Sequence, residues 1–402
     1  MEKFKLDNMQ DTVPALNLND TSLAFRAKSD AQLKRAFWLF KMIDSPFLTK
    51  VGPKMLQFGL DMGLPLEGVV RSTIFELFVG GESLKDTART TRHLAEFGVK
   101  TILDYSVEGE KTEAGFDATR DEILDTIRHG GKHEAVAFSA CKMTGLGDFD
   151  LMAKIQAKRQ LTEAESEAFT RMIQRIEEIA ALAAEEQTPI FIDAEESWIQ
   201  EVIDEIAEGL MERYNQTKPV IFTTVQHYRW DRLEYLKGLI QRSKEKGYIL
   251  GVKLVRGAYL EKERLRAEEM GYPDPIQPNK AASDKDYNAA LELCMEHLDH
   301  VAICAGTHND QSSLYLTELM QAKGVAPGHP YIWFAQLLGM SDNISFNLSH
   351  AGYNVAKYLP YGPVKSVLPY LIRRAEENTS VAGQASRETS LLGQEVRRRK
   401  SC

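Results

Sequence analysis

Residues 219–255 read PVIFTTVQHYRWDRLEYLKGLIQRSKEKGYILGVKLV and contain the clearest structural pattern in the chain. Two short runs of β-branched and apolar residues, 219–226 and 248–255, flank the segment 230–247, where apolar residues recur every three or four positions. Short apolar runs are typical of buried strands, and the three- to four-residue spacing is typical of an amphipathic helix. A strand, a helix and another strand in this order predict a parallel βαβ unit.

The same alternation continues through most of the chain. Helix-like stretches such as 163–186 and 284–298 separate further short apolar runs. With the two runs above, these bring the number of candidate strands to eight, the others being 99–105, 134–142, 189–195, 301–308, 331–338 and 353–359. Eight strand–helix units predict an α/β fold, a (β/α)8 barrel of the TIM type. We expect a distorted barrel that forms the catalytic domain over residues 91–385.

The two ends of the chain do not follow this rhythm. Residues 1–90 predict a helical segment packed on the barrel, since 29–46 has helical spacing and begins with the capping residues Ser29 or Asp30. Residues 386–402 predict a helical and basic tail. We interpret its RRRK run, residues 397–400, as solvated, and a contact with a membrane surface is the alternative.

Composition excludes several classes of protein. The chain has 402 residues and a net charge of −9, which disfavours a nucleic-acid partner because phosphate neutralisation needs a basic face. Its four cysteines lack CxxC spacing, so we expect a reducing compartment and neither a zinc site nor another metal centre.

No apolar run reaches the roughly 18 residues of a membrane span, and the first residues do not resemble a signal peptide. We therefore expect a cytoplasmic protein. A Rossmann domain is disfavoured because no GxGxxG follows a strand.

Polar residues stand at the ends of five consecutive predicted strands. Barrel enzymes place their chemistry at the carboxyl ends of the strands. A single polar strand end is commonly a structural hydrogen-bonding partner, but five in succession predict a site. From the second predicted strand to the sixth, these residues are Lys142, Asp193, Gln226, Lys253 with Arg256, and Thr307 with His308.

A second candidate feature follows the last predicted strand, where residues 358–378 read YLPYGPVKSVLPYLIRRAEEN. A turn rich in proline and glycine precedes a predicted helix over about 367–378. On that helix Tyr370, Arg373 and Arg374 share one arc. Because a guanidinium group matches a carboxylate with two parallel hydrogen bonds, the arginine pair predicts an anchor for a substrate carboxylate. Ion pairs on a surface helix are the alternative.

Seven stretches of the chain resemble the proline dehydrogenase family, the flavoenzymes that oxidise L-proline to Δ1-pyrroline-5-carboxylate. They occur in family order and include long motifs. KLVRGAYL and KYLPYGP resemble the mitochondrial-type monofunctional enzymes more than the bifunctional bacterial ones, and the chain length leaves no room for an aldehyde dehydrogenase domain. The stretches are FSACKMTGLG (138–147), IDAEES (192–197), TTVQHY (223–228), GVKLVRGAYLEKER (251–264), AGTHN (305–309), FAQLLGM (334–340) and YLPYGPVKSVLPYLIRR (358–374).

The resemblance assigns a role to each candidate residue. Lys142 and Asp193 would form a catalytic pair, and Lys142 would share the substrate carboxylate with Arg373 and Arg374. The walls of the pyrrolidine site would be Tyr259, Leu337, Tyr358 and Tyr370. The contacts with FAD would be Ala194, Gln226, Lys253, Arg256, Gly257, Ala258, Thr307 and His308. Lys253 occupies a place that is arginine in many bacterial relatives.

The resemblance also implies the chemistry. The Cα/Cδ edge of proline would give hydride to flavin N5, and the protein would supply position through the carboxylate clamp and the apolar walls. Lys253 or Arg256 would stabilise the reduced flavin, while Asp193 or solvent would accept the amine proton. Electrons would pass to a quinone, with the protein in a bacterial cytoplasm or peripheral at the inner membrane. Tyrosine at position 358 is the residue of proline-specific members, whereas hydroxyproline-oxidising relatives carry serine.

Three alternative functions remain open at this point. The first is a hydroxyproline dehydrogenase of the same family. The second is a lyase that uses Lys142 or Lys253 to form a Schiff base in an aldolase-like barrel. The third is an amino-acid-binding or scaffold protein, since a barrel does not by itself fix a function.

Overall fold

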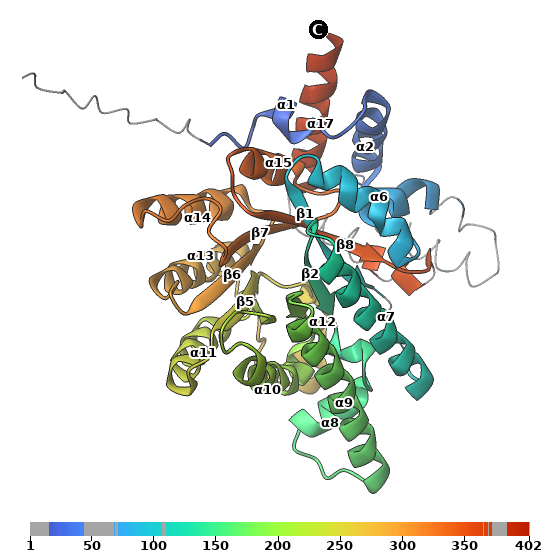
Figure 1. Cartoon of the computed structure of the whole chain (residues 1–402), viewed down its shortest axis with the longest axis vertical. Coiled ribbons are helices and arrows are strands. Elements are labelled where there is room, and N and C mark those ends of the chain that lie inside the picture. Colours follow the sequence, from blue (N-terminus) through green and yellow to red (C-terminus); the bar gives the residue numbers. More distant parts are fainter. Residues whose placement is uncertain are drawn as a thin grey trace, which may run out of the picture.

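Eight parallel strands close a barrel in the order of the sequence (Figure 1). The computed structural model describes residues 16–43, 68, 71–106, 110–364, 366–368, 370–371 and 384–401. Parallel pairing continues around the whole barrel and includes the closing pair of the first and last strands. The (β/α)8 fold of the TIM type is therefore confirmed. Its strands are β1 (Val99–Tyr105), β2 (Val136–Cys141), β3 (Ile190–Ile192), β4 (Ile221–Gln226), β5 (Leu250–Val255), β6 (Val301–Gly306), β7 (Ile332–Leu337) and β8 (Val355–Tyr361).

Helices surround the barrel, as the sequence pattern predicts (Figure 1). Thr162 and Glu165 form a capping box that starts one of them, α9, and Gly247 in the left-handed region ends another, α11. In none of the described helices is a stretch both long and apolar enough to cross a membrane. The helices that alternate with the strands are α6 (Leu84–Ala95), α7 (Glu113–Lys132), α9 (Glu163–Glu185), α10 (Ser197–Tyr214), α11 (Arg232–Lys246), α13 (Lys280–Glu296), α14 (Asp310–Ala322) and α15 (Asp342–His350).

Two of the connections contain additional helical elements. The chain between β2 and α9 forms a 3₁₀ turn, η2 (Met143–Gly145), and α8 (Phe149–Gln156). The chain between β5 and α13 forms α12 (Leu260–Met270). Both insertions follow the carboxyl end of a strand, where additions to a barrel surround the site rather than the core.

Aromatic side chains fill the interior of the barrel. Phe138 of β2 stacks on Phe191 of β3 with 4.4 Å between ring centroids, and both rings meet Phe222 of β4 at 5.4 Å. Small residues complete this buried layer from the other strands, for example Ala302 and Ala356. The interior is therefore a packed core, and polar chemistry is confined to the carboxyl rim above it.

The ends of the chain form a second apolar cluster outside the barrel. The N-terminal part contributes Phe25, Leu33 and Phe40, and the C-terminal helix contributes Leu391 and Leu392. Figure 1 shows the C-terminal helix beside α2, in agreement with their extensive contact. The elements outside the alternating pattern are α1 (Thr21–Ala24), α2 (Asp30–Ile43), a π-helical turn η1 (Arg71–Phe75), α5 (Glu76–Phe78) and α17 (Gln384–Lys400).

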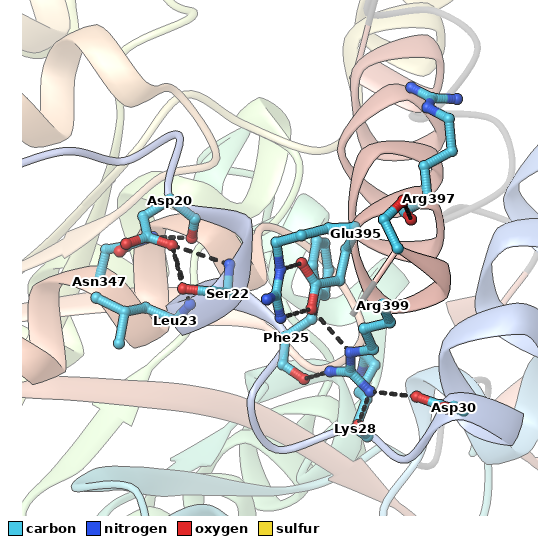
Figure 2. A network of polar contacts seen from close by, with 12 residues as sticks. Asp20, Ser22, Leu23, Phe25, Lys28, Asp30, Asn347, Glu395, Arg397 and Arg399 are labelled. Carbon is cyan, nitrogen blue, oxygen red and sulfur yellow. Dashed lines mark hydrogen bonds and ion pairs between the residues drawn. The ribbon is translucent and has the colours of Figure 1, made fainter.

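The interpretation of the RRRK run as a solvated tail is wrong for Arg399. Its guanidinium donates to the carbonyl oxygens of Phe25 and Lys28, each at 2.8 Å, and to Asp30 at 2.9 Å (Figure 2). Buried Glu395 accepts from it at 2.8 Å. Phe25, Lys28 and Asp30 come from the other end of the chain, so the sequence around residues 397–400 gives no sign of these three acceptors.

Candidate active site

Asp193 is the centre of a polar cluster at the carboxyl rim of the barrel. It directly follows β3, and its Oδ1 accepts a hydrogen bond from Nζ of Lys253 in β5. Its Oδ2 accepts from the Tyr358 hydroxyl of β8 at 2.8 Å. Lys253 Nζ also lies 4.7 Å from the ring centroid of Phe191 and 5.3 Å from that of Tyr358. Three strands far apart in sequence thus hold one ionic and aromatic cluster.

The predicted pair of Lys142 with Asp193 needs correction. Asp193 pairs with Lys253, whereas Lys142 lies 3.9 Å from Oδ2 of Asp104, at the end of β1. Spacing along the chain cannot separate these pairings, because strand tilt and barrel closure determine which rim residues meet.

Asp104 is a rim residue that the sequence reasoning missed. It is only 1% exposed and accepts a hydrogen bond from the Ser106 hydroxyl. Burial raises the pKa of this carboxyl, and the Lys142 ammonium opposes that rise. The available signal was its place, one residue before the end of the first predicted strand.

Glu195 is a second buried carboxyl that sequence reasoning missed. It accepts from the Thr144 N–H at 3.0 Å and from the Thr144 hydroxyl. Burial raises the pKa of Glu195 to about 7. Its position at the end of the third predicted run, within the motif IDAEES, was the available signal. The rim therefore carries more acidic groups than the sequence analysis assigned to it.

The ring of Tyr358 belongs to the same cluster. Burial, together with the negative charges of Asp104 and Asp193, raises its pKa well above the usual value. The phenol therefore stays protonated and donates to Asp193 across the neutral range.

The other predicted substrate residues lie on neighbouring elements. Leu337 of β7 lies beside Tyr358 in the strand register, and Tyr370 is buried in the helical segment that follows β8. Tyr259 caps α12. Arg373 and Arg374 lie outside the described residues.

A second group of predicted residues gathers at the ends of β4, β5 and β6. Arg256 donates to Asp284 at 2.7 Å, to the Thr307 hydroxyl at 2.8 Å and to the Ser312 hydroxyl at 2.9 Å. Its guanidinium also lies 4.4 Å from the ring centroid of Tyr287. Because neighbouring side chains accept from all three nitrogens of the guanidinium, its position is fixed before any ligand binds.

Some buried polar atoms in this second group have no partner in the part of the chain that the structure describes. Gln226 donates its amide N–H to the Glu195 carbonyl at 3.1 Å, but its buried Oε1 has no partner among the described residues. Both ring nitrogens of buried His227 are likewise unpartnered there. A buried polar group without a partner is costly, so such atoms at a rim indicate a ligand or water.

The loop after β5 brings backbone close to this group. Gly257 has φ of +144°, and an added Cβ would lie 2.4 Å from the Tyr228 ring. Only glycine fits there. Ala258 follows in the same loop, and Ala194 is buried next to Asp193. His308, two residues beyond β6, lies 2.9 Å from the Ser341 hydroxyl through its Nδ1.

Comparisons with known proteins identify the family of this chain. A family model described as proline dehydrogenase matches residues 87–387. The chain is 33% identical to the carbapenem antibiotics biosynthesis protein CarD of Pectobacterium carotovorum subsp. carotovorum, over 83% of this chain and 86% of that protein. It is 30% identical to mitochondrial proline dehydrogenase 1 of Dictyostelium discoideum, over 94% of this chain and 74% of that protein. Identity to the hydroxyproline dehydrogenase of Xenopus laevis is also 30%, over 96% and 90% of the two chains.

A solved structure shares the fold. Proline utilization A (PutA) from Bdellovibrio bacteriovorus, inactivated by N-propargylglycine, superposes with a TM-score of 0.72 at 21% identity. The match covers 93% of this chain and 40% of that larger protein. Together with the match to most of the barrel, these relatives show that the chain belongs to the proline dehydrogenase family.

Proposed function

We propose that this protein is an FAD-dependent enzyme that oxidises L-proline to Δ1-pyrroline-5-carboxylate and passes the electrons to a quinone. The observation that carries the proposal is the meeting, at one barrel rim, of the Asp193–Lys253–Tyr358 cluster with the group fixed around Arg256. Family membership supplies the reaction class, and this geometry supports the proposal that the reaction takes place at this rim.

The second group at the rim has the donors and acceptors that FAD requires. The polar edge of a flavin presents one N–H donor between two carbonyl acceptors. The unpartnered Oε1 of Gln226 can accept from that N–H, and Lys253 and Arg256 supply positive charge for the acceptors. Thr307 and His308 would complete the cofactor contacts. When bound, FAD supplies the hydride acceptor that no side chain can provide.

The first group would position the substrate. Tyr259, Leu337, Tyr358 and Tyr370 would enclose the ring of proline, and Lys142 would face its carboxylate together with Arg373 and Arg374. Both oxygens of Asp193 already accept hydrogen bonds, so we assign this carboxylate to orienting Lys253 and Tyr358. Asp193 or solvent would accept the amine proton.

The same contacts argue against Lys253 as the reactive lysine of a Schiff-base lyase. An ammonium group that is hydrogen-bonded to a carboxylate has no lone pair with which to attack a carbonyl. Lys253 is held in this way by Asp193. A test is borohydride treatment with pyruvate or another carbonyl compound, which should leave the mass of the protein unchanged.

Cofactor binding is the first test of the proposal. Apoprotein titrated with FAD should quench the flavin fluorescence to a stoichiometric end point. The reconstituted enzyme should reduce a soluble quinone with L-proline and no nicotinamide, and faster than it reduces oxygen. A protein that takes up no flavin would contradict the cofactor assignment. Faster reduction of oxygen than of the quinone would contradict the quinone assignment, and with it the peripheral membrane contact that a membrane quinone implies.

Hydroxyproline is the second candidate substrate, because a relative covering most of the chain is named a hydroxyproline dehydrogenase. Tyr358 favours proline. Its hydroxyl already donates to Asp193, and its ring leaves a C4 hydroxyl without a partner, at a cost of about 1–3 kcal/mol. In Tyr358→Ser, the ratio of kcat/KM for L-proline to that for trans-4-hydroxy-L-proline should fall roughly 5- to 150-fold. An unchanged ratio in a folded variant that holds flavin would contradict this role.

A further inference from the structure

The turn between β7 and α15 has an unusual backbone. Ser341 has φ of 49° and ψ of 45°, the left-handed conformation that glycine normally occupies. It is buried, at 3% exposure. A side-chain-bearing residue stays in this region only when its surroundings hold it there.

Two contacts with side chains of other elements extend from Ser341 in opposite directions. Its backbone N–H donates to Oε1 of Glu388 in α17 at 2.6 Å, and its hydroxyl lies 2.9 Å from Nδ1 of His308. Glu388 is itself buried. A single residue therefore links the C-terminal helix to the ring of His308, a predicted contact of FAD.

The neighbouring residue anchors the turn independently. Asp342 pairs with Lys357 of β8 at 2.8 Å and with Lys28 from the N-terminal part at 3.0 Å. Lys357 also donates to the Met340 carbonyl. These contacts fix the turn as a whole, whereas only Glu388 accepts from the Ser341 N–H among the described residues.

The helix that carries Glu388 is held at both ends. Near its start, Arg387 forms an ion pair with Asp310 in the first turn of α14. Near its end, Arg399 binds the carbonyl oxygens of Phe25 and Lys28 (Figure 2). Because both anchors lie on other elements, the position of Glu388 does not depend on the turn that it contacts.

We propose that Glu388 of the C-terminal helix is a positioning residue for the cofactor site. It holds Ser341 in the left-handed conformation, and the Ser341 hydroxyl fixes the ring of His308. This inference rests on the proposed function, since His308 contacts FAD only if the protein binds FAD. The terminal helix then does more than cover the barrel: it sets one wall of the cofactor site from outside.

The first experiment measures the dissociation constant of FAD by fluorescence quenching. Glu388→Ala removes the acceptor, and Ser341→Ala removes the hydroxyl while it keeps the contact with Glu388. Both substitutions should raise the dissociation constant of FAD about 5- to 10-fold, which is the effect of one lost hydrogen bond. Glu388→Gln keeps an acceptor oxygen and should bind FAD within about twofold of wild type.

Glu395→Ala is the matched control. It lies on the same helix and is also buried, but it contacts Arg398 and Arg399 rather than the turn. It should lower the melting temperature and leave the affinity for FAD unchanged. Equal losses of affinity in Glu395→Ala and Glu388→Ala would mean that only stability is affected, which would overturn the proposal.

A second readout does not need the cofactor. In apoprotein labelled with [13C,15N]histidine, the ring signals of His308 are those that disappear in His308→Asn. The chemical shifts of these signals should change in Glu388→Ala and Ser341→Ala and should stay the same in Glu395→Ala. If the wild type binds no FAD but these signals move, the proposed function fails and the positioning chain stands. If FAD binds and neither the signals nor the affinity change, the positioning role is wrong.

Discussion

Lys357 and Tyr358 are neighbours in β8, but their side chains serve opposite faces of the barrel wall. Tyr358 points inward to Asp193, which also binds Lys253. Lys357 points outward to Asp342, which also binds Lys28. Each face thus carries an aspartate with two donors, and strand geometry separates the two strand residues that contact them by a single position.

The two clusters differ in what surrounds them. The outer one is enclosed by protein, since the turn before α15, the N-terminal part and α17 all contribute to it. The inner one lies beside Gln226, whose Oε1 is buried without a partner among the described residues. We infer that the outer cluster stabilises the fold and that the inner cluster binds ligands. The predictions below test this division.

The largest expected effect is on stability and follows from the outer cluster. Lys357→Met leaves Asp342 buried with one partner fewer and should lower the free energy of unfolding by about 3–5 kcal/mol. Lys28→Met is the control, because Lys28 is 23% exposed and its loss should cost only about 1 kcal/mol. Urea denaturation measures both variants. Equal effects would mean that burial does not distinguish the two lysines.

Substitutions in the inner cluster should lower the activity rather than the stability. Lys253→Met removes the ammonium held by Asp193 and should lower kcat/KM for L-proline about 100-fold. Lys253→Arg keeps the charge and should stay within about tenfold of wild type. Steady-state assays with a soluble quinone measure both. A loss of stability in Lys253→Met as large as that in Lys357→Met would break the comparison.

Glu388 should make stability depend on pH. Burial and the nearby charge of Asp342 raise its pKa to about 7, against the effects of the Ser341 N–H, Lys357 and Arg387. Between the unfolded pKa of 4.5 and the folded pKa of about 7, Glu388 is protonated in the folded state and ionised in the unfolded state. Its contribution to the free energy of unfolding is therefore complete below pH 4.5 and is lost as pH rises through about 7.

Glu388→Gln should remove that contribution, of about 3 kcal/mol, from the pH dependence of the free energy of unfolding. Denaturation at pH 5, 6, 7 and 8 measures it, and the wild type should lose more stability over this range than the variant does. Glu195, whose pKa is also about 7, remains in both proteins and cancels in the difference. Parallel pH profiles for the two proteins would contradict the prediction.

The smallest expected effect tests one hydrogen bond of the inner cluster. Tyr358→Phe keeps the ring and removes the hydroxyl that donates to Asp193. It should raise the activation free energy for L-proline oxidation by about 1 kcal/mol, which lowers kcat/KM roughly fivefold. The melting temperature should stay nearly unchanged. A loss as large as that of Lys253→Met would mean that the hydroxyl, rather than the lysine, organises Asp193.

The sequence predicted the barrel because its pattern is local. Strand runs and helical spacing are visible within short windows, and the polar residues that end β2 to β6 could be read at once as one rim. The partners within that rim were not predictable. Lys253, rather than Lys142, pairs with Asp193 because the tilt of the closed barrel brings strands together in a way that spacing does not record.

Contacts of the C-terminal helix were hidden for a related reason. Arg399 looked solvated because its acceptors, the carbonyl oxygens of Phe25 and Lys28, have no sequence signature. The contact of Glu388 with Ser341 joins residues on separate elements, and nothing near either residue indicates the other. Such contacts depend on how the ends pack, which periodicity does not encode.

An anaerobic titration of the purified, flavin-loaded protein with L-proline tests the central claim most directly. The visible flavin absorbance should bleach in proportion to the L-proline added, without nicotinamide, and Δ1-pyrroline-5-carboxylate should form in equal amount. trans-4-Hydroxy-L-proline at the same concentration should bleach it much more slowly. A flavin that stays oxidised in excess L-proline would contradict the assignment of this rim to proline oxidation.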